Sequence, residues 1–511
     1  MDQVLALEVL LSGENVLLTG PAGSGKTYVL NQFIRMAKQE GQYVAVTATT
    51  GLAATHLNGT TIHAWSGIGI HDSLPEKYHE NFTQARLDAI IAADVLIIDE
   101  ISMLHDFRLD MVNQVAQKIR KSDEPFGGIQ IVLCGDFFQL PPINREGQTA
   151  GSFVIHSEVW EELNPVICYL TEQHRQNDDE YLDILSALRA GDIRRHHAEQ
   201  LLARQDVTLS EDMPITELHT TNVNVDQINA RELAKLPGKE YTFHMSTTGK
   251  EHYVENLKRA CLANDVLVLK KGALVMCIKN NPEKKYVNGS VGTIIDFEPI
   301  TGFPKVELKN GRTVVIAPDT WELRDGDKKR AGLTQIPLRL AWAITIHKSQ
   351  GMTLDSARID LRKAFVEGMG YVALSRVRSL DTLSLAGINQ MALRVSPEAL
   401  RIDEHLRKKS SEQSKEFEHL RAKAASRKQT VVQKAVNNWA DKVTKMRKDH
   451  VNAYKPWSEK DDQELVSLFM DGKEVNIKEL TEKFGRHPGS IKARLKKHFG
   501  DDVVITKITE K

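Results

Sequence analysis

A run of eight residues near the amino terminus has the composition and spacing of a phosphate-binding loop. It consists of Gly20, Pro21, Ala22, Gly23, Ser24, Gly25, Lys26 and Thr27. An apolar stretch precedes it and a segment with helical apolar spacing follows, which is the context that the pattern G-x-x-x-x-G-K-S/T requires. Such loops turn backbone N–H groups and a helix start toward phosphates, so Lys26 should hold the β and γ phosphates of ATP and Thr27 should ligate Mg²⁺.

Two carboxylates follow a second apolar stretch. Asp99 and Glu100 come directly after residues 95–98, and ligands of parallel sheets bind at the carboxyl ends of the strands. Asp99 would hold the magnesium and Glu100 would polarise the attacking water. Gln139, after a third apolar run at 129–134, would sense the γ phosphate. This set favours ATP hydrolysis over transfer to a small molecule; the plainer alternative is that the two carboxylates cap the next helix.

These residues need an α/β sheet to bring them together. Apolar runs of strand length, separated by helical segments, indicate a parallel sheet that is buried on both faces. We therefore predict one α/β domain at residues 1–165. A second alternating region covers 166–254 and 336–395, and a stretch rich in Val, Ile and turn pairs at 255–335 predicts a small β insertion within it.

The last part of the chain has a different composition. Residues 396–455 are rich in Lys, Arg, Glu, Gln and Ala, which predicts exposed helices with a basic balance, either a solvated face or an accessory nucleic-acid contact. Residues 456–511 have the apolar spacing of three short helices and resemble a Myb-like helix-turn-helix module. Its third helix carries Lys492 and Arg494 and would enter the major groove of duplex DNA; docking to another protein is the alternative.

The overall composition excludes several classes of protein. Hydrophobic residues at 41% and charged residues at 26% are typical of globular proteins, and no apolar run is long enough to predict a membrane span. The four cysteines are widely spaced, which predicts free thiols in a reducing compartment and no zinc site. A net charge of −1 means that any nucleic-acid contact must be local. The phosphate loop lies so near Met1 that we expect no targeting leader and a cytoplasmic protein.

Several blocks occur in the order of the motifs of Pif-type superfamily 1 helicases, relatives of RecD and of the phage helicase Dda. Asp-Glu-Ile-Ser-Met at 99–103 resembles motif II and Gly-Asp-Phe-Phe-Gln-Leu-Pro-Pro at 135–142 resembles motif III. The other blocks that resemble this family lie at 47–54 (motif Ia), 59–65, 173–176 (motif IV), 345–355 (motif V) and 371–376 (motif VI). The resemblance extends over residues 1–390 or so.

The resemblance implies both a fold and a function. The fold is α/β, with two RecA-like parallel-sheet domains, an SH3-like β insertion called subdomain 2B at 255–335, a pin that parts the duplex at 66–90, and a helical C-terminal extension. The function is that of an ATP-dependent DNA helicase that moves 5′ to 3′ on single-stranded DNA and unwinds duplex at junctions, in replication, repair, recombination or telomere maintenance. We expect a monomer in a bacterial or phage-like cytoplasm, associated with the nucleoid when on DNA.

The resemblance also gives roles to individual residues. Arg175 and Arg376 would reach the γ phosphate as arginine fingers. Gln3 would read adenine, and Gln350 and Gly351 would complete the nucleotide site. The residues that would contact the single strand are Thr47, His63, Trp65, His347, Lys348 and Ser349. Outside such motifs, a histidine like His63 is more often a structural side chain.

Two other functions remain open at this point. A helicase directed to RNA would use the same residues, because contacts to a sugar-phosphate backbone tolerate a 2′-hydroxyl. A clamp that binds nucleic acid in response to ATP, without moving, would keep Lys26 but would have no use for two arginine fingers.

Overall fold

The computed structural model describes residues 1–57, 59–69, 72–142, 144, 149–173, 178–209, 215–261, 263–279, 281, 283, 285–286, 288–308, 311–325, 328–424, 446–453, 455, 457–471, 475–499 and 508–509. The chain divides into two compact units, Met1–Arg421 and Ala422–Lys511. Within the described ranges, no helix has the length and apolar character needed to span a bilayer. The four cysteines are free, as their spacing predicted, and all four are buried.

The first lobe of the larger unit is built on a parallel sheet of six strands in the order β3-β2-β4-β5-β1-β6. The strands are β1 (Val16–Thr19), β2 (Val44–Ala48), β3 (Thr60–Thr61), β4 (Val95–Asp99), β5 (Gln130–Gly135) and β6 (Val166–Tyr169). The helices are α1 (Gln3–Leu11), α2 (Lys26–Gln39), α3 (Gly51–His56), α4 (Ile62–Ser66), α5 (Gln84–Ala92), α6 (Asp106–Arg120) and α7 (Val159–Leu163). Val16 and Leu18 belong to one hydrophobic core and Leu17 to another, because successive strand residues face opposite sides of a sheet that is covered on both.

One strand lies in a different domain from the one predicted. The boundary proposed at residue 165 places Val166–Tyr169 in the second domain, whereas β6 pairs in parallel with β1 and completes the first sheet. The apolar run itself was visible in the sequence, but its pairing partner was not. The first lobe therefore extends to Tyr169 at least.

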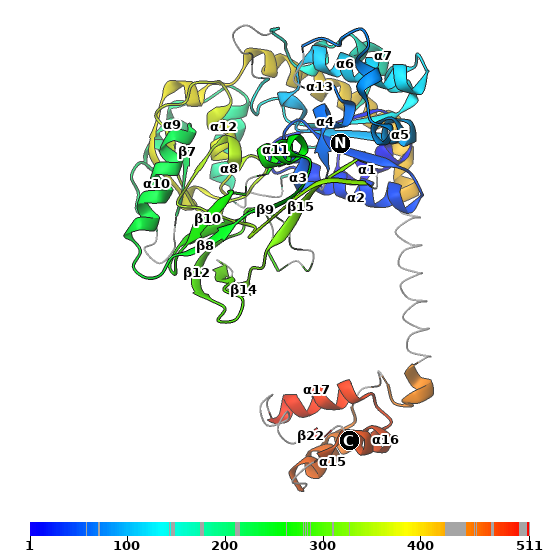
Figure 1. Cartoon of the computed structure of the whole chain (residues 1–511), viewed down its shortest axis with the longest axis vertical. Coiled ribbons are helices and arrows are strands. Elements are labelled where there is room, and N and C mark those ends of the chain that lie inside the picture. The colour runs from blue at the N-terminus through cyan, green and yellow to red at the C-terminus, as the bar shows by residue number, and fades with distance from the viewer. Residues whose placement is uncertain are drawn as a thin grey trace. The chain divides into compact units, whose positions relative to one another are not determined.

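The second lobe is a smaller parallel sheet in the order β18-β7-β19-β20. Its strands are β7 (Thr216–His219), β18 (Ala343–Thr345), β19 (Ala357–Leu361) and β20 (Leu383–Ile388). Its helices are α8 (Asp179–Arg189), α9 (Arg195–Leu202), α10 (Asn222–Lys235) and α12 (Met369–Leu374). Figure 1 shows these elements beside the first lobe. The predicted fold class, two RecA-like sheets joined in one chain, is confirmed by this pair.

An antiparallel β region interrupts the second lobe, as predicted. A sheet in the order β14-β13-β12-β11-β17 surrounds its own core, and β9 adds to the long hairpin of β15 and β16. The strands are β8 (Tyr241–His244), β9 (Ser246–Gly249), β10 (Val266–Leu269), β11 (Leu274–Cys277), β12 (Val291–Phe297), β13 (Pro304–Leu308), β14 (Thr313–Val315), β15 (Asp319–Asp325), β16 (Lys328–Gln335) and β17 (Leu338–Leu340), with α11 (Glu251–Ala260) between β9 and β10. The insertion is thus wider than residues 255–335. α11 contacts α3, and β15 contacts α5, so the insertion, which interrupts the second lobe, also touches the first lobe.

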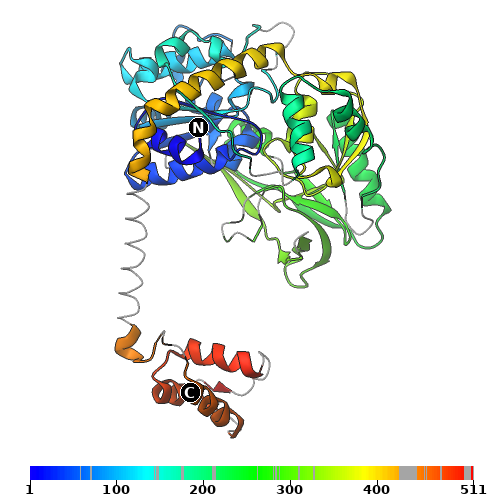
Figure 2. The same cartoon turned by 180° about the vertical axis from the view of Figure 1, so that it is seen from behind.

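A long helix after the second lobe returns to the first. α13 (Pro397–Glu416) crosses the first lobe, as the gold helix in Figure 2 shows. The backbone N–H of Ile167 donates to Gln413 Oε1 at 2.8 Å and that of Tyr169 donates to Ser410 Oγ at 3.1 Å. Side chains of α13 therefore satisfy the outer edge of β6, whose amides would otherwise lack partners. The prediction of exposed helices at 396–455 is therefore wrong for α13, which buries one of its faces.

Removal of α13 is expected to destabilise the larger unit. A chain that ends after Met391 leaves the Ile167 and Tyr169 amides without acceptors, at about 1–3 kcal/mol each if they stay buried, and uncovers apolar surface. A chain that ends after Ala424 keeps these contacts. Thermal unfolding of the two truncated chains should show a lower Tm for the shorter one only. Equal Tm values would mean that α13 contributes nothing to the lobe.

Among the described residues of 457–499 in the smaller unit, three helices lie at the positions that the apolar spacing predicted. They are α15 (Glu459–Asp471), α16 (Ile477–Phe484) and α17 (Pro488–Phe499), around one apolar core. β21 (Val475–Asn476) pairs with β22 (Ile508–Thr509). Arg494 forms two bonds of 2.6 Å to the Asp462 carboxylate, so this side chain, predicted to face DNA, holds α17 to α15.

Candidate nucleotide and nucleic-acid site

The phosphate loop joins β1 to α2, and its glycines are required by the backbone. Gly25, directly before α2, has φ +86°, a conformation that favours glycine. Gly20 has φ +140°, and a Cβ at this position would collide with the carbonyl oxygen of Leu170. The pocket at the loop is lined by Ala22, Gly23, Gly25, Lys26, Thr27, Ala53, Asp99, Glu100, Cys134, Gly135, Gln139, Gly351, Thr353, Arg376 and Arg378. It thus includes side chains from both lobes.

Lys26 is held over the loop by the loop's own carbonyl groups. Its Nζ donates to Gly20 O at 2.9 Å and to Pro21 O at 3.0 Å. Burial lowers the pKa of Lys26, which Asp136 and other acidic neighbours partly offset. A phosphate oxygen would be a stronger acceptor than either carbonyl, because hydrogen bonds between charged groups are stronger than neutral ones. The geometry fits the predicted contact to phosphate.

Asp99 ends β4, and the next residue turns the chain so that both carboxylates line the pocket. Glu100 has φ +53°, an uncommon conformation for a residue with a side chain, and its N–H donates to Asp99 Oδ1 at 2.9 Å. Burial raises the pKa of Asp99. Burial, together with the charge of Asp99, raises the pKa of Glu100 to about 7. The Thr27 hydroxyl and the Asp99 carboxylate are the hard oxygen ligands that Mg²⁺ prefers.

A glutamine from the second lobe reaches the carboxylate of the first. Gln350 Nε2 donates to Glu100 Oε2 at 3.0 Å and to Gln139 Oε1 at 2.9 Å. The sequence assigned Gln350 to the nucleotide and Gln139 to the γ phosphate. In this arrangement the two glutamines also orient the residue predicted to activate water.

One predicted arginine finger lines the pocket. Arg376 is 1% exposed; its Nε donates to Val372 O at 2.7 Å and its Nη2 to Ser375 Oγ at 2.7 Å. Its charge also opposes the rise in the pKa of Glu100. The other predicted finger, Arg175, lies outside the described residues.

Five residues that line the pocket were not assigned to it from the sequence: Ala53, Cys134, Gly135, Thr353 and Arg378. Arg378 Nε lies 4.0 Å from Asp355 Oδ1. The sequence offered one signal for Arg378, which stands two positions after Arg376, just beyond the block that resembles motif VI. Gln3, by contrast, was predicted: its Nε2 donates to Ser24 O at 3.0 Å, which places the side chain against the phosphate loop.

Several side chains predicted to contact DNA are buried in this structure. Thr47 is fully buried and its hydroxyl donates to Ile97 O at 2.6 Å, within the sheet. Ser349 is also fully buried, with its hydroxyl on Ile346 O at 2.7 Å. Trp65 is 9% exposed and packs in the core of the first lobe. These three side chains stabilise the fold here and do not offer a surface for stacking or for phosphate.

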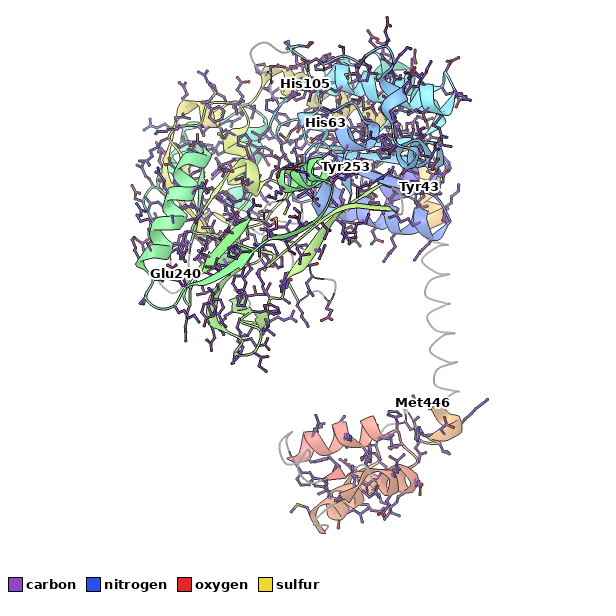
Figure 3. All side chains as sticks on the ribbon, in the orientation of Figure 1. Tyr43, His63, His105, Glu240, Tyr253 and Met446 are labelled. Carbon is purple, nitrogen blue, oxygen red and sulfur yellow. The ribbon has the colours of Figure 1, made fainter. Side chains whose placement is uncertain are left out.

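His63, His347 and Lys348 are more accessible. Arg108 Nη1 lies 3.2 Å from His63 Nε2, and Arg108 Nη2 donates to Asp72 Oδ1 at 3.3 Å. Burial, with the charge of Arg108, lowers the pKa of His63 to about 4, so the histidine is neutral at pH 7. Figure 3 labels His63 on the first lobe. His347 and Lys348 are partly exposed at the start of a 3₁₀ turn.

Comparison with known proteins agrees with this geometry. The family described as PIF1-like helicase matches residues 1–199, and the one described as DNA helicase Pif1, 2B domain, matches residues 252–297. The chain is 41% identical to ATP-dependent DNA helicase Pif1 of Psychrobacter sp. over 82% of this chain and 73% of that protein. It is 37% identical to ATP-dependent DNA helicase PIF1 of Xenopus laevis over 80% of this chain, and it spans 64% of that protein's length.

Comparison with solved structures also finds Pif1 helicases. Pif1 of Bacteroides sp in complex with ADP-AlF4 matches with a TM-score of 0.70 and 30% identity, over 80% of this chain and 97% of that one. Bacteroides Pif1 bound to single-stranded DNA matches with a TM-score of 0.59 and 30% identity, over 79% of this chain and 96% of that one. Similarity to the relatives covers both lobes, and the helicase and 2B descriptions match separate segments in the expected order. The chain therefore belongs to the Pif1-like helicase family.

Proposed function

We propose that this chain is an ATP-dependent DNA helicase that moves 5′ to 3′ along single-stranded DNA and opens duplex at junctions. The observation that carries the proposal is the pocket between the lobes. The phosphate loop, Asp99 and Glu100 come from the first lobe, whereas Gln350 and Arg376 come from the second. Hydrolysis at such a pocket depends on closure of the two lobes over the nucleotide. A motor requires this dependence, whereas a passive clamp does not.

Each residue has a defined task when ATP and Mg²⁺ are bound. Lys26 would hold the β and γ phosphates, and Thr27 and Asp99 would hold Mg²⁺, which neutralises phosphate charge. Glu100, held by Gln350, would orient the attacking water and take its proton. Arg376 would stabilise charge on the transferred phosphoryl group. Closure and reopening of the lobes would then shift the grip on the strand by about one nucleotide per ATP.

The contact to the strand would come from residues that remain accessible. His347 and Lys348 on the second lobe, and the His63–Arg108 pair on the first, offer donors to phosphate oxygens. Arg108 takes the place of a charged His63, since the histidine is neutral near pH 7. Stepwise movement requires that both lobes contact the DNA strand.

The polarity and the substrate are tested by unwinding of tailed duplexes. A DNA duplex with a single 5′ tail should be opened with ATP and Mg²⁺, whereas the same duplex with a 3′ tail should not. Single-stranded DNA should stimulate ATP turnover more than RNA of the same sequence. Unwinding from 3′ tails alone would refute the polarity, stronger stimulation by RNA would favour the RNA-directed alternative, and turnover indifferent to nucleic acid would favour the clamp.

The rate of ATP hydrolysis should depend on pH through Glu100. Its pKa of about 7 is raised above the ordinary value, so the carboxylate that acts as base is lost as pH falls through about 7. Since kcat/KM reports the free enzyme, it should rise with pH and fall about tenfold per unit below pH 6. A measurement of ATP turnover at several pH values checks this. A flat kcat/KM from about pH 5.5 to 8 would contradict the role of Glu100 as the base.

The smaller unit is proposed to bind duplex DNA through α17. Lys496 and Lys497 are exposed on this helix, while Arg494 is engaged with Asp462. A chain that ends after Ala424 should keep DNA-stimulated ATP turnover and lose affinity for duplex without tails. Unchanged duplex affinity would favour the alternative of a protein-docking module. We further propose that the helicase acts as a monomer on DNA in the cytoplasm.

A further inference from the structure

One buried arginine, which the nucleotide pocket does not include, connects the segments that form that pocket. Arg189 is the last residue of α8 and is 5% exposed. Its Nη1 donates to Asp136 Oδ1 at 2.6 Å and to the Tyr371 hydroxyl at 3.2 Å. Its Nη2 donates to Asp403 Oδ1 at 2.9 Å and to the Tyr169 hydroxyl at 3.1 Å. The guanidinium thus bonds to four side chains at once.

These partners come from different parts of the larger unit. Asp136 follows β5 of the first lobe, Tyr371 lies on α12 of the second, and Asp403 lies on α13. The guanidinium also stacks on the Phe138 ring, with its central carbon 4.1 Å from the ring centre. A planar fork with charged hydrogen bonds on two sides fixes geometry as well as charge, which a flexible ammonium group does not.

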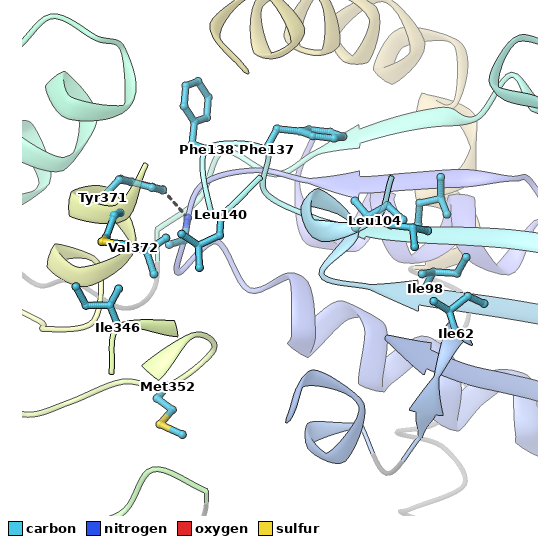
Figure 4. Close-up of a cluster of buried hydrophobic side chains, with 14 of the residues drawn as sticks. Ile62, Ile98, Leu104, Phe137, Phe138, Leu140, Ile346, Met352, Tyr371 and Val372 are labelled. Atoms are coloured by element: carbon cyan, nitrogen blue, oxygen red, sulfur yellow. Dashed lines mark hydrogen bonds between the residues drawn. The ribbon is translucent and has the colours of Figure 1, made fainter. Parts of the chain in front are cut away.

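The cluster reaches the phosphate loop through Tyr371. The backbone N–H of Ala22 donates to the Tyr371 hydroxyl at 2.9 Å, the bond drawn as a dashed line in Figure 4. The same hydroxyl donates to Asp136 Oδ2 at 3.3 Å. A single oxygen therefore links a loop residue of the first lobe, a helix of the second lobe and the Arg189 cluster.

The cluster also holds the turn that presents Gln139. Asp136 Oδ1, the acceptor of Arg189, accepts the backbone N–H of Phe138 at 3.2 Å, and the Gln139 N–H donates to Asp136 O at 3.0 Å. Gln139 in turn bonds to Gln350, which holds Glu100. Asp136 is fully buried, so its charge needs a permanent partner.

We propose that Arg189 is a positioning residue for ATP hydrolysis, which holds the phosphate loop, the Gln139 turn and helix α12, which ends just before Arg376, in one arrangement. None of the four hydrogen bonds of Arg189 goes to a residue that lines the pocket, so it acts through Asp136 and Tyr371. The inference rests on the proposed ATP-driven function. It predicts that damage to the cluster slows the chemical step more than it weakens nucleotide binding, because Lys26 and the loop glycines remain to bind phosphate, whereas the Gln139 turn and the second lobe lose their alignment with the loop.

The test compares full-length variants by kcat of DNA-stimulated ATP hydrolysis and by Kd for a fluorescent ATP analogue. Arg189→Lys keeps the charge and loses the fork; Tyr371→Phe removes only the hydroxyl and keeps the charges. Both should lower kcat by at least about tenfold and change Kd by less than about threefold. Arg407→Ala is the matched control: Arg407 bonds the other oxygen of Asp403 at 2.6 Å and lies over the Tyr169 ring, so its loss disturbs the two partners of Arg189 that are not bonded to the phosphate loop or to the Gln139 turn. Its kcat should stay within about twofold of the parent.

A double-mutant cycle separates positioning from simple loss of stability. Gln139→Ala should lower kcat by a smaller factor in the Arg189→Lys variant than in the parent chain, because both substitutions disturb the same turn. Additive effects would overturn the inference, as would a kcat of Tyr371→Phe equal to that of the parent. Should Arg189→Lys fail to fold, Tyr371→Phe decides alone. If the parent chain itself does not hydrolyse ATP, the proposed function has failed; if the parent hydrolyses ATP and both variants match it, only the role of Arg189 has failed.

Discussion

Arg376→Ala is expected to lower kcat of DNA-stimulated ATP hydrolysis by roughly 10³-fold, the usual effect of losing an arginine finger. The guanidinium lines the nucleotide pocket opposite the phosphate loop and is 1% exposed. In such an enclosed site, a fixed positive charge stabilises the transition state more than water would. ATP affinity should change little, because Lys26 and the loop amides remain. Turnover and nucleotide binding are measured on the same preparation.

Two further variants define the cause of that loss. Arg376→Lys keeps a charge but lacks the fork that bonds to Val372 O and Ser375 Oγ, so it should recover only a small part of the rate. Arg362→Ala removes an arginine of the second lobe that pairs with Asp360 on the surface, and it should match the parent. Turnover by Arg376→Ala close to that of the parent would show that hydrolysis does not need the Arg376 guanidinium.

Glu100→Gln is expected to bind ATP and to hydrolyse it about 10²–10⁴-fold more slowly, the range for loss of a general base. Glutamine has the same shape and can keep a hydrogen bond to Gln350, so the pocket should remain formed. It removes the group that accepts the proton of the attacking water. Binding of a fluorescent ATP analogue and single-turnover hydrolysis measure the two effects separately.

The comparison for Glu100→Gln is an acidic residue of the same lobe with no role in the pocket. Glu161 on α7 is exposed and does not line the pocket, so Glu161→Gln should hydrolyse ATP at the parental rate. In Glu100→Gln the fall in kcat/KM below pH 7 should also vanish. A normal rate in Glu100→Gln would mean that another group activates the water.

Much of the site was readable from the sequence because its chemistry is local. The phosphate loop needs glycines at fixed positions before a helix, and Asp99 and Glu100 must follow a buried strand. Both patterns can be recognised within a few residues of sequence. The structure brings Lys26, Asp99, Glu100, Gln139 and Arg376 to one pocket. The order of the remaining blocks was enough to identify two lobes with an insertion.

What the sequence could not give depends on pairing across long separations. β6 joins the first sheet through β1, and α13 satisfies its outer edge through Ser410 and Gln413. Arg189 meets Asp403 only after the chain has crossed from one lobe to the other. The residues next to Arg189 in the sequence do not show whether this arginine, at the end of a helix, is buried among four partners or exposed to solvent.

The DNA contacts show a different limit. Thr47 belongs to a block that resembles a strand-binding motif, yet its hydroxyl donates to Ile97 O inside the sheet. A threonine in a strand fits equally well on a buried face and on an exposed one, since its methyl group packs and its hydroxyl needs only one acceptor. Burial, which only the fold decides, separates the two roles.

The most direct test of the central claim, that both lobes act on one phosphate, is a crystal structure of the chain with ADP, aluminium fluoride, Mg²⁺ and single-stranded DNA. The claim predicts Lys26 Nζ and the Arg376 guanidinium on opposite sides of the fluoride, each within about 3 Å of it. A structure in which Arg376 still bonds only to Val372 O and Ser375 Oγ, with water between its guanidinium and the fluoride, would contradict the claim.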